Sequence, residues 1–136
     1  MGTDSTILDE LMSAISSGDL EVIHGLLDPD LVSHGALGDI HGPEGFIQVM
    51  VANVRNAYPD VKVKAVGLIK QGDMISWRIE GSGTHSGPFL GLAPTGKQIR
   101  IQGIHQGRIK DGRLVEHWQG PDILAMLVDM GRVPFT

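Results

Sequence analysis

Cysteine is absent from the 136 residues of this chain, which excludes a disulfide framework, thiolate catalysis and cysteine-ligated metal. Basic residues are few and scattered, because 11 Lys and Arg stand against 16 Asp and Glu, so no footprint for nucleic acid or an anionic membrane exists. No apolar run approaches the roughly 18 residues of a membrane span, and the first residues lack the basic segment of a signal peptide. We therefore expect a cytoplasmic protein with neither nucleic-acid nor membrane partners.

The overall composition is that of a globular protein. Hydrophobic residues make up 41% of the chain and charged residues 20%, although aromatic residues account for only 4%. A chain of this length suits one compact domain. We therefore predict a single domain over residues 1–136.

The first half of the chain has the 3.6-residue apolar period of helices. Gly18 is typical of a helix end, Asp19 of an N-cap, and Pro29 of a residue that stops a helix. We expect helices over residues 4–17, 20–27 and 43–57, with a short strand over 31–34.

After residue 60 the period changes to 2, which predicts strands. The expected strands are 61–70, 73–85, 97–109 and 113–119, joined mostly by short hairpin loops. A final helix begins at Pro121-Asp122 and ends at Gly131. The pattern predicts the α+β class, with a curved antiparallel sheet forming a cone that the N-terminal helices close, and with a C-terminal helix.

Glycines recur on the apolar faces of two of these strands. They are Gly81, Gly83, Gly103 and Gly107, at positions where a flat sheet packed on helices would carry side chains. Their small size favours strong curvature or a cavity. We therefore expect a hollow cone.

The register of the last hairpin decides which side chains share its inner face. A two-residue turn would pair Lys110 with Arg113 and set His105 on the face opposite to Gln119. A three-residue loop would pair Ile109 with Arg113, so that His105 faces His117 with Gln119 nearby. We favour the second register, which gathers a polar cluster on an apolar face.

Three segments carry a resemblance to a known family: GTHSG at 83–87, GLAPTG at 91–96 and DGRLVEHW at 111–118. They resemble the SnoaL-like polyketide cyclases of the nuclear-transport-factor-two-like fold, and the helical half of the chain is similar too. In this family an aspartate directly after the Glu-His-Trp stretch is the general acid/base of an intramolecular aldol closure. His105 matches the family's neighbouring histidine, but Gln119 stands at the aspartate position. Because an amide does not exchange protons at neutral pH, that role is not carried over.

The candidate catalytic residues are His105, Gln119 and His34. The imidazole of His105 is the natural proton carrier when no inward carboxylate is present. Gln119 is placed either to donate to a substrate oxygen or to hydrogen-bond His105. His34 is expected at the mouth of the cone. Candidate substrate-binding residues are Met50, Asn53, Trp77, Phe89, Leu90 and His117.

The leading hypothesis is a cyclase that needs no cofactor and closes a ring in a hydrophobic polyketide-type carbonyl substrate. One alternative is a hydrolase or isomerase of the same fold, for instance acting on an epoxide. Another is a non-catalytic module that binds a small molecule, because Gln119 replaces the acid/base aspartate. No metal is expected, since the histidines lack the spacing of a metal motif. The partner we expect is a second copy of the chain, in a homodimer or a dimer of dimers.

Overall fold

A computed structural model describes residues 4–133 of the chain. Its helices are α1 (Asp4–Ser17), α2 (Leu20–Leu26), α3 (Gly42–Phe46), the π-helical η1 (Ile47–Ala52), α4 (Asn53–Ala57) and α5 (Ile123–Met130). Its strands are β1 (Leu27–Gly35), β2 (Gly38–His41), β3 (Lys62–Gln71), β4 (Met74–Thr84), β5 (Gln98–Arg100), β6 (Gly103–Lys110) and β7 (Arg113–Trp118). The predicted α+β class is confirmed.

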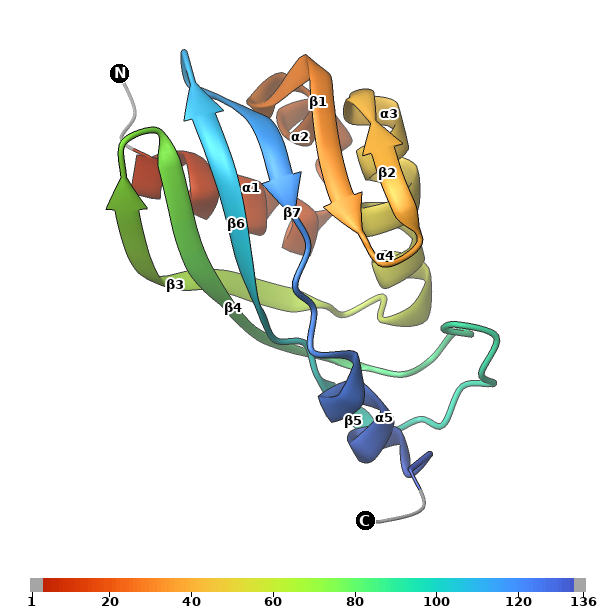
Figure 1. Ribbon diagram of the computed structural model, residues 1–136. Coiled ribbons are helices and arrows are strands. Elements are labelled where there is room, and N and C mark those ends of the chain that lie inside the picture. The colour runs from red at the N-terminus through yellow and green to blue at the C-terminus, as the bar shows by residue number, and fades with distance from the viewer. Residues whose placement is uncertain (1–3, 134–136) are drawn as a thin grey trace.

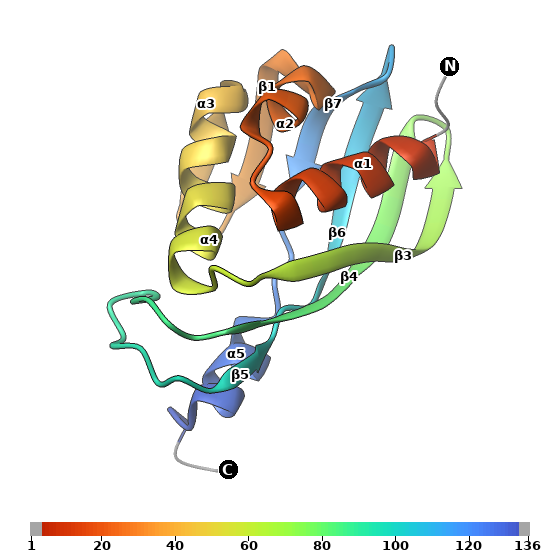
Figure 2. The same ribbon diagram turned by 180° about the vertical axis from the view of Figure 1, so that it is seen from behind.

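The strands form one curved sheet, and α1 to α4 lie against the face toward which it curves (Figures 1 and 2). The strand order is β2-β1-β7-β6-β4-β3, with β5 added beside β4. The sheet is not closed, and α5 lies at one end of it, next to β5 (Figure 1). The helices therefore make the inner face of the sheet the core of the protein.

The helix ends follow the local signals in the sequence. Gly18 takes a left-handed φ of +77°, and its N–H donates to the Ala14 carbonyl at 2.8 Å, which closes α1. The Asp19 carboxylate accepts from the Val22 N–H at 3.2 Å and caps α2. Asp122 does the same for α5, accepting from Ala125 at 3.0 Å. These predicted boundaries are confirmed to within a residue or two.

The sheet is not purely antiparallel, which corrects one prediction. β1 pairs in parallel with β7, so that Ser33 lies beside His117 and His34 beside Trp118. β1 is also longer than the expected strand over 31–34, and β2 was not predicted. The parallel pairing is possible because α3, α4 and the β3–β6 strands intervene in sequence and bring the chain back in the same direction.

The expected strand over 97–109 is broken into β5 and β6. At the break, the Gln102 carbonyl accepts from the Asp122 N–H at 2.9 Å, and the Gln102 amide donates to the Asp122 carboxylate at 2.9 Å. Gly103 lies so close to the Gly120 carbonyl that a Cβ would approach it to 2.4 Å. The break therefore admits the segment that leads from β7 into α5.

The favoured hairpin register is wrong at the turn. Lys110 pairs with Arg113, and Asp111 and Gly112 both have positive φ, 52° and 75°, as a two-residue type I′ turn requires. A bulge next to the turn then shifts the register so that Gly107 pairs with His117. The bulge adds one residue to β7, so His105 and Gly107 point to the same side of the sheet as His117. His105 and His117 therefore share the inner face, as the favoured register predicted.

The glycines mark close packing rather than a hollow, which corrects the expectation of a cavity at these positions. A Cβ on Gly107 would lie 2.7 Å from Leu114 Cδ1 and 3.0 Å from the Trp77 ring. A Cβ on Gly83 would lie 2.7 Å from Tyr58 Cβ, and one on Gly81 would meet a backbone carbonyl at 2.1 Å. Trp77, which is 2% exposed, fills the inner face. A cleft of about 550 Å³ instead lies between α1 and β3.

Candidate functional site

Adjacent strands each contribute one buried side chain to a row across the inner face of the sheet. From β1 to β4 the row runs Ser33, His117, His105 and Trp77. Ser33 is the register partner of His117, and Trp77 is the register partner of His105. The row therefore follows from strand pairing, which sets polar groups side by side within an apolar core.

Hydrogen bonds join this row into a chain. The Gln119 amide donates to Ser33 Oγ at 3.0 Å, and Ser33 Oγ lies 2.8 Å from His117 Nδ1. His117 Nε2 lies 3.1 Å from His105 Nδ1, which also accepts from the backbone N–H of Gly120 at 3.4 Å. One continuous path thus connects the Gln119 side chain to the His105 ring.

Burial keeps both imidazoles neutral near pH 7. Loss of solvation lowers the pKa of His105 to about 4. Burial, followed by the proximity of His105, lowers the pKa of His117 to about 3. The two rings are nearly parallel, at 8°, and Trp77 lies close to parallel with both. A neutral imidazole has one donor nitrogen and one acceptor nitrogen. The donors along the hydrogen-bond chain therefore all point the same way.

The hydrogen-bond chain ends at Nε2, the second ring nitrogen of His105. Within residues 4–133, no hydrogen-bond partner lies beside His105 Nε2. Within residues 4–133 the fully enclosed polar atoms without a partner are Tyr58 OH, Trp77 Nε1 and His85 Nε2, so His105 Nε2, which also lacks a partner there, is not fully enclosed. This nitrogen is therefore the end of the hydrogen-bond chain that remains for a partner from outside the protein.

Gln119 lies beside the row, but it does not contact His105. Its carboxamide packs over Gly35, where a Cβ would approach Oε1 to 2.5 Å, and it donates a hydrogen bond to Ser33. Of the two expected roles of Gln119, the direct hydrogen bond to His105 is not formed, and a path through Ser33 and His117 joins the two residues instead. Gly35 permits this position because a larger residue would displace the amide.

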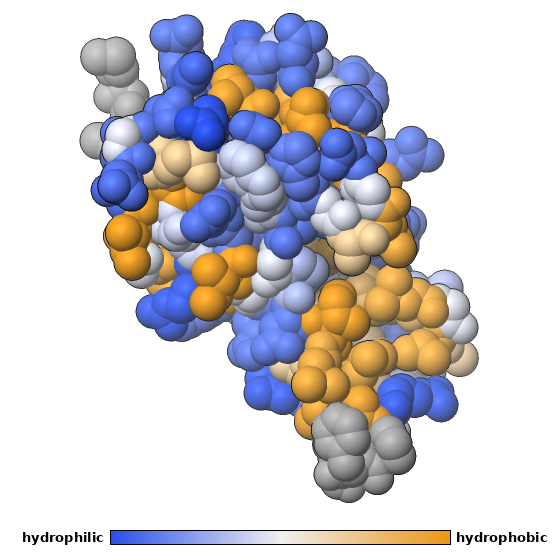
Figure 3. Space-filling view, in the orientation of Figure 1, coloured by the Kyte–Doolittle hydropathy of each residue, from blue (hydrophilic) through white to orange (hydrophobic). Residues whose placement is uncertain are grey.

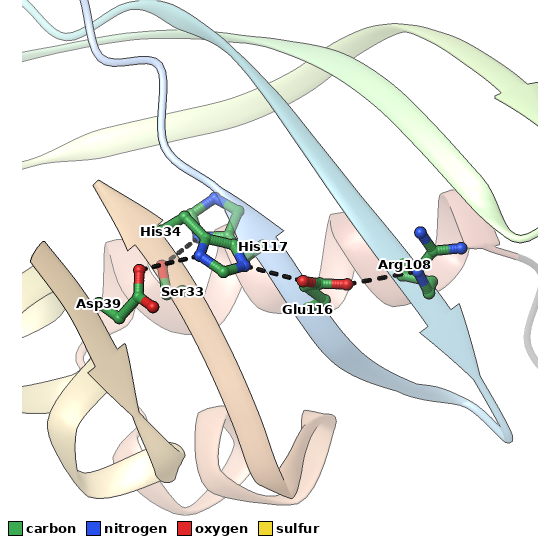
Figure 4. Close-up of polar contacts among 6 residues, drawn as sticks. All are labelled: Ser33, His34, Asp39, Arg108, Glu116 and His117. Carbon is green, nitrogen blue, oxygen red and sulfur yellow. Dashed lines mark hydrogen bonds and ion pairs between the residues drawn. The ribbon is translucent and has the colours of Figure 1, made fainter. Parts of the chain in front are cut away.

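His34 lies on the outer face of the sheet, away from His105, and this corrects its predicted place at the mouth of a cone. Its ring nitrogens contact Asp39 at 2.9 Å and Glu116 at 2.8 Å (Figure 4). Hydrogen bonds from Glu116 first and Asp39 second raise the pKa of His34. Glu116 also contacts Arg108, so His34 belongs to a charged network on the outer face.

The predicted wall residues are divided between the core and the surface. Met50 is partly buried against the core that contains Trp77, whereas Phe89 belongs to a second cluster around Tyr58. Asn53 is exposed on α4 and does not line the interior.

Leu90 is also outside the interior. It is 60% exposed at the tip of a turn, with a φ of +51°. Apolar surface gathers over α5 and its surroundings at this end of the molecule (Figure 3), where Leu124 is 53% exposed. Leu90 therefore lies on the surface and not in a wall beside His105.

Ser33 is the member of the chain that sequence reasoning missed. No local signal singled it out, because Leu31 and Val32 give β1 an apolar residue on each face; in the structure Leu31 and Ser33 are the buried ones. His85, in contrast, has a structural place: its Nδ1 accepts from the Thr95 N–H at 3.2 Å, which ties together the two ends of the loop after β4.

No three histidine or acidic side chains within residues 4–133 gather in a way that would hold a metal ion. No helix in the same span is both long and apolar enough to cross a membrane.

The comparisons with known proteins agree with this fold. A family model described as SnoaL-like polyketide cyclase matches residues 6–130, so the chain belongs to that family. It is 27% identical over 115 residues to the aklanonic acid methyl ester cyclase AcmA of Streptomyces galilaeus, covering 82% of this chain and 79% of AcmA. It is also 27% identical over 124 residues to the nogalonic acid methyl ester cyclase of Streptomyces nogalater, covering 89% and 92%. The crystal structure of wild-type IdmH from Streptomyces antibioticus matches with a TM-score of 0.82 and 33% identity, covering 96% of this chain and 99% of IdmH.

Proposed function

We propose that this member of the polyketide cyclase family closes a carbon ring in a hydrophobic, polyketide-type ester, with His105 as the group that meets the reacting oxygen or carbon. The observation that carries the proposal is the buried hydrogen-bond chain that ends at His105 Nε2. Family membership supports the reaction class, and the two relatives named as methyl ester cyclases support the substrate class.

An aldol closure balances without a redox cofactor. A proton leaves the carbon next to one carbonyl, that carbon bonds to a second carbonyl carbon, and the oxygen of the second carbonyl gains a proton. Holding both reacting groups in one molecule near each other supplies part of the rate. Stabilising the oxygen as it gains negative charge supplies another part. His105 suits the second task because its imidazole is neutral near pH 7 and its Nε2 is not among the fully enclosed atoms that lack a partner.

The buried polar groups favour this chemistry over epoxide hydrolysis. Among residues 4–133 the buried polar and charged residues are Ser33, His85, His105 and His117, and none is a carboxylate. Epoxide chemistry in this fold would use inward carboxylates to activate water and protonate the leaving oxygen. A neutral histidine chain instead suits polarisation of a carbonyl.

Turnover of the relatives' substrates tests the proposal. Purified protein is incubated with aklanonic acid methyl ester and with nogalonic acid methyl ester, and the cyclised product is measured for the wild type, His105→Ala and His41→Ala. His41 is an exposed histidine and serves as the matched control. We expect His105→Ala to lower turnover by roughly 100-fold, as loss of an oxyanion donor does, and His41→Ala to leave it unchanged. Equal turnover in all three proteins would remove His105 from the mechanism.

A second measurement separates an enzyme from a binding module. Incubation of the same esters in deuterated water reports exchange at the carbon next to the carbonyl, and binding alone causes no exchange. Exchange or ring closure that requires the protein supports the enzyme. Tight binding with neither outcome would favour the non-catalytic alternative.

We also propose a homodimer through the outer face of the sheet. Ile104 is 65% exposed on that face, where it pairs with Arg78 of β4. Ile104→Asp should then convert a dimeric mass in solution to a monomeric one, and a wild-type protein that is already monomeric would contradict the proposal.

A further inference from the structure

The hydrogen-bond chain from Gln119 to His105 allows two arrangements of its protons. Ser33 and the neutral imidazoles can each donate or accept at a given atom, but the choice at one contact forces the choice at the next. In one arrangement His105 carries its proton on Nε2, and in the other on Nδ1. The two differ in what the outside partner of His105 meets, namely a hydrogen-bond donor or a lone pair.

The contact from the Gly120 backbone shows which arrangement is present. Its N–H can only donate, and it points at His105 Nδ1 at 3.4 Å, so that Nδ1 is an acceptor. His117 Nε2, at 3.1 Å, must then donate to the same atom. His117 Nδ1 is left as an acceptor for the Ser33 hydroxyl at 2.8 Å, and Ser33 Oγ accepts from the Gln119 amide. Every contact in the chain is satisfied in this one direction.

We propose that Gln119 is a positioning residue which, through Ser33 and His117, holds His105 as the tautomer protonated at Nε2. His105 then presents an N–H to the substrate and acts as a hydrogen-bond donor to a keto oxygen rather than as a proton acceptor. The tautomer is a property of the folded protein alone, whereas the donation to a keto oxygen rests on the proposed function. A neutral imidazole that donates in this way stabilises a developing enolate or alkoxide without transferring its proton.

The proposal explains why an amide at position 119 suits this chain. A carboxylate there has no proton, so it could only accept, and the Ser33 hydroxyl would turn to donate to it. His117 would then donate from Nδ1 to Ser33 and accept at Nε2 from His105 Nδ1. The whole chain would reverse, and His105 Nε2 would become a lone pair. The cost of reversal is the long contact from the Gly120 N–H, which loses its acceptor.

Nitrogen NMR of the protein with nitrogen-15 in its histidines tests the tautomer directly, because protonated and unprotonated ring nitrogens have distinct shifts. The spectra are recorded at about pH 7.5, where unshifted histidines are also largely neutral. We expect wild-type His105 and His117 to be protonated at Nε2 and Gln119→Glu to move both protons to Nδ1. His105 protonated at Nδ1 in the wild type would overturn the proposal, and so would an unchanged tautomer in a folded Gln119→Glu protein.

Gln106→Glu is the matched control. Gln106 also donates its amide to a serine hydroxyl, Ser76 Oγ at 3.0 Å, but on the outer face of the sheet. This variant makes the same chemical change in a neighbouring strand and should leave both tautomers unchanged. Should Gln119→Glu fail to fold, Ser33→Ala breaks the chain by removing its hydroxyl, and we expect His117 to lose its single-tautomer spectrum. A single Nε2–H form in Ser33→Ala would show that Gln119 does not control the ring.

Turnover of the two methyl esters by the same proteins separates this proposal from the proposed function. If the tautomer reverses in Gln119→Glu and ring closure falls by about 100-fold, while Gln106→Glu is normal in both, the donor role is supported. If the tautomer reverses but turnover is unchanged, the donor role is wrong. If the wild type closes no ring yet shows the Nε2–H tautomer, the proposed function fails and the control of the tautomer by Gln119 stands.

Discussion

Ser33 and His117 lie 84 positions apart in the sequence, yet they are register partners on parallel strands, with 2.8 Å between Ser33 Oγ and His117 Nδ1. The contact gives the inner histidine of β7 a partner at Nδ1, while His105 partners its Nε2. Both ring nitrogens of a buried histidine are thus satisfied by neutral groups. The protein therefore buries two imidazoles without burying a charge.

This neutral pair makes stability depend on pH. The pKa values of His105 and His117 are lowered in the folded protein to about 4 and about 3, whereas an unfolded histidine titrates near 6.5. As the pH falls from 6.5 toward 4, the unfolded chain binds protons at these two histidines that the folded protein does not bind. The free energy of unfolding therefore decreases. His105 alone accounts for a loss on the order of 3 kcal/mol across that window.

Urea unfolding at a series of pH values between 7 and 4 measures this loss. His117→Gln removes one of the two groups and should flatten the dependence, although its stability at neutral pH will be lower. His41→Gln, which changes an exposed imidazole, controls for the loss of a histidine as such. The raised pKa of His34 acts in the opposite direction, because protonation there favours the folded protein, but the side chain is partly exposed and its effect is small. Stability that stays constant from pH 6.5 to 4 would contradict the burial of neutral imidazoles.

Gly107 is packed too closely to accept a side chain. Alanine there would place a Cβ 2.7 Å from Leu114 Cδ1 and 3.0 Å from the Trp77 ring, so we expect Gly107→Ala to lower the free energy of unfolding by about 1–3 kcal/mol. Gly25 in α2 is the matched control, since nothing lies within 4 Å of its would-be Cβ. Gly25→Ala should stabilise the protein by up to about 1 kcal/mol because alanine favours helix. Urea midpoints of both variants decide the matter, and a neutral Gly107→Ala would indicate a hollow at Trp77 after all.

Arg55 closes the end of α1 from another helix. Its Nη1 donates to the carbonyls of Ile15 and Ser16 at 3.0 and 2.9 Å, which lie in the last turn of α1 and lack partners within the helix. Because these bonds involve a charged donor, Arg55→Ala should cost about 2 kcal/mol of unfolding free energy. Arg113→Ala, at an exposed position on β7, should change it by less than about 0.5 kcal/mol. Equal unfolding midpoints for the two variants would show that Arg55 does not stabilise α1.

Much of the fold was predictable because its signals are local. The caps at Asp19 and Asp122 and the glycine at 18 fix helix ends through bonds made within a few residues. Alternation placed Trp77 and His105 on the inner face correctly, since the period of a strand is a property of its own sequence.

The errors arose where a tertiary contact decides the outcome. Asp111-Gly112 is compatible with either loop, and the bulge next to it depends on how β7 meets both β6 and β1. The segment Leu31 to His34 has an apolar residue on each face, so its sequence alone does not say whether Ser33 or His34 points inward. The parallel pairing with His117 settles the question, and that pairing is not a local property.

The outer-face position of His34 yields a prediction that separates its two carboxylate partners. The hydrogen bond from Glu116 is the larger cause of its raised pKa, and the one from Asp39 is the smaller. Glu116→Gln should therefore lower the pKa of His34 more than Asp39→Asn does, as measured by NMR titration of its ring protons. Asp73→Asn is the control, because Asp73 contacts Arg108 on the same face but not His34. A His34 pKa that is insensitive to Glu116→Gln would mean that the 2.8 Å contact does not persist in solution, and that His34 is free to reach another partner.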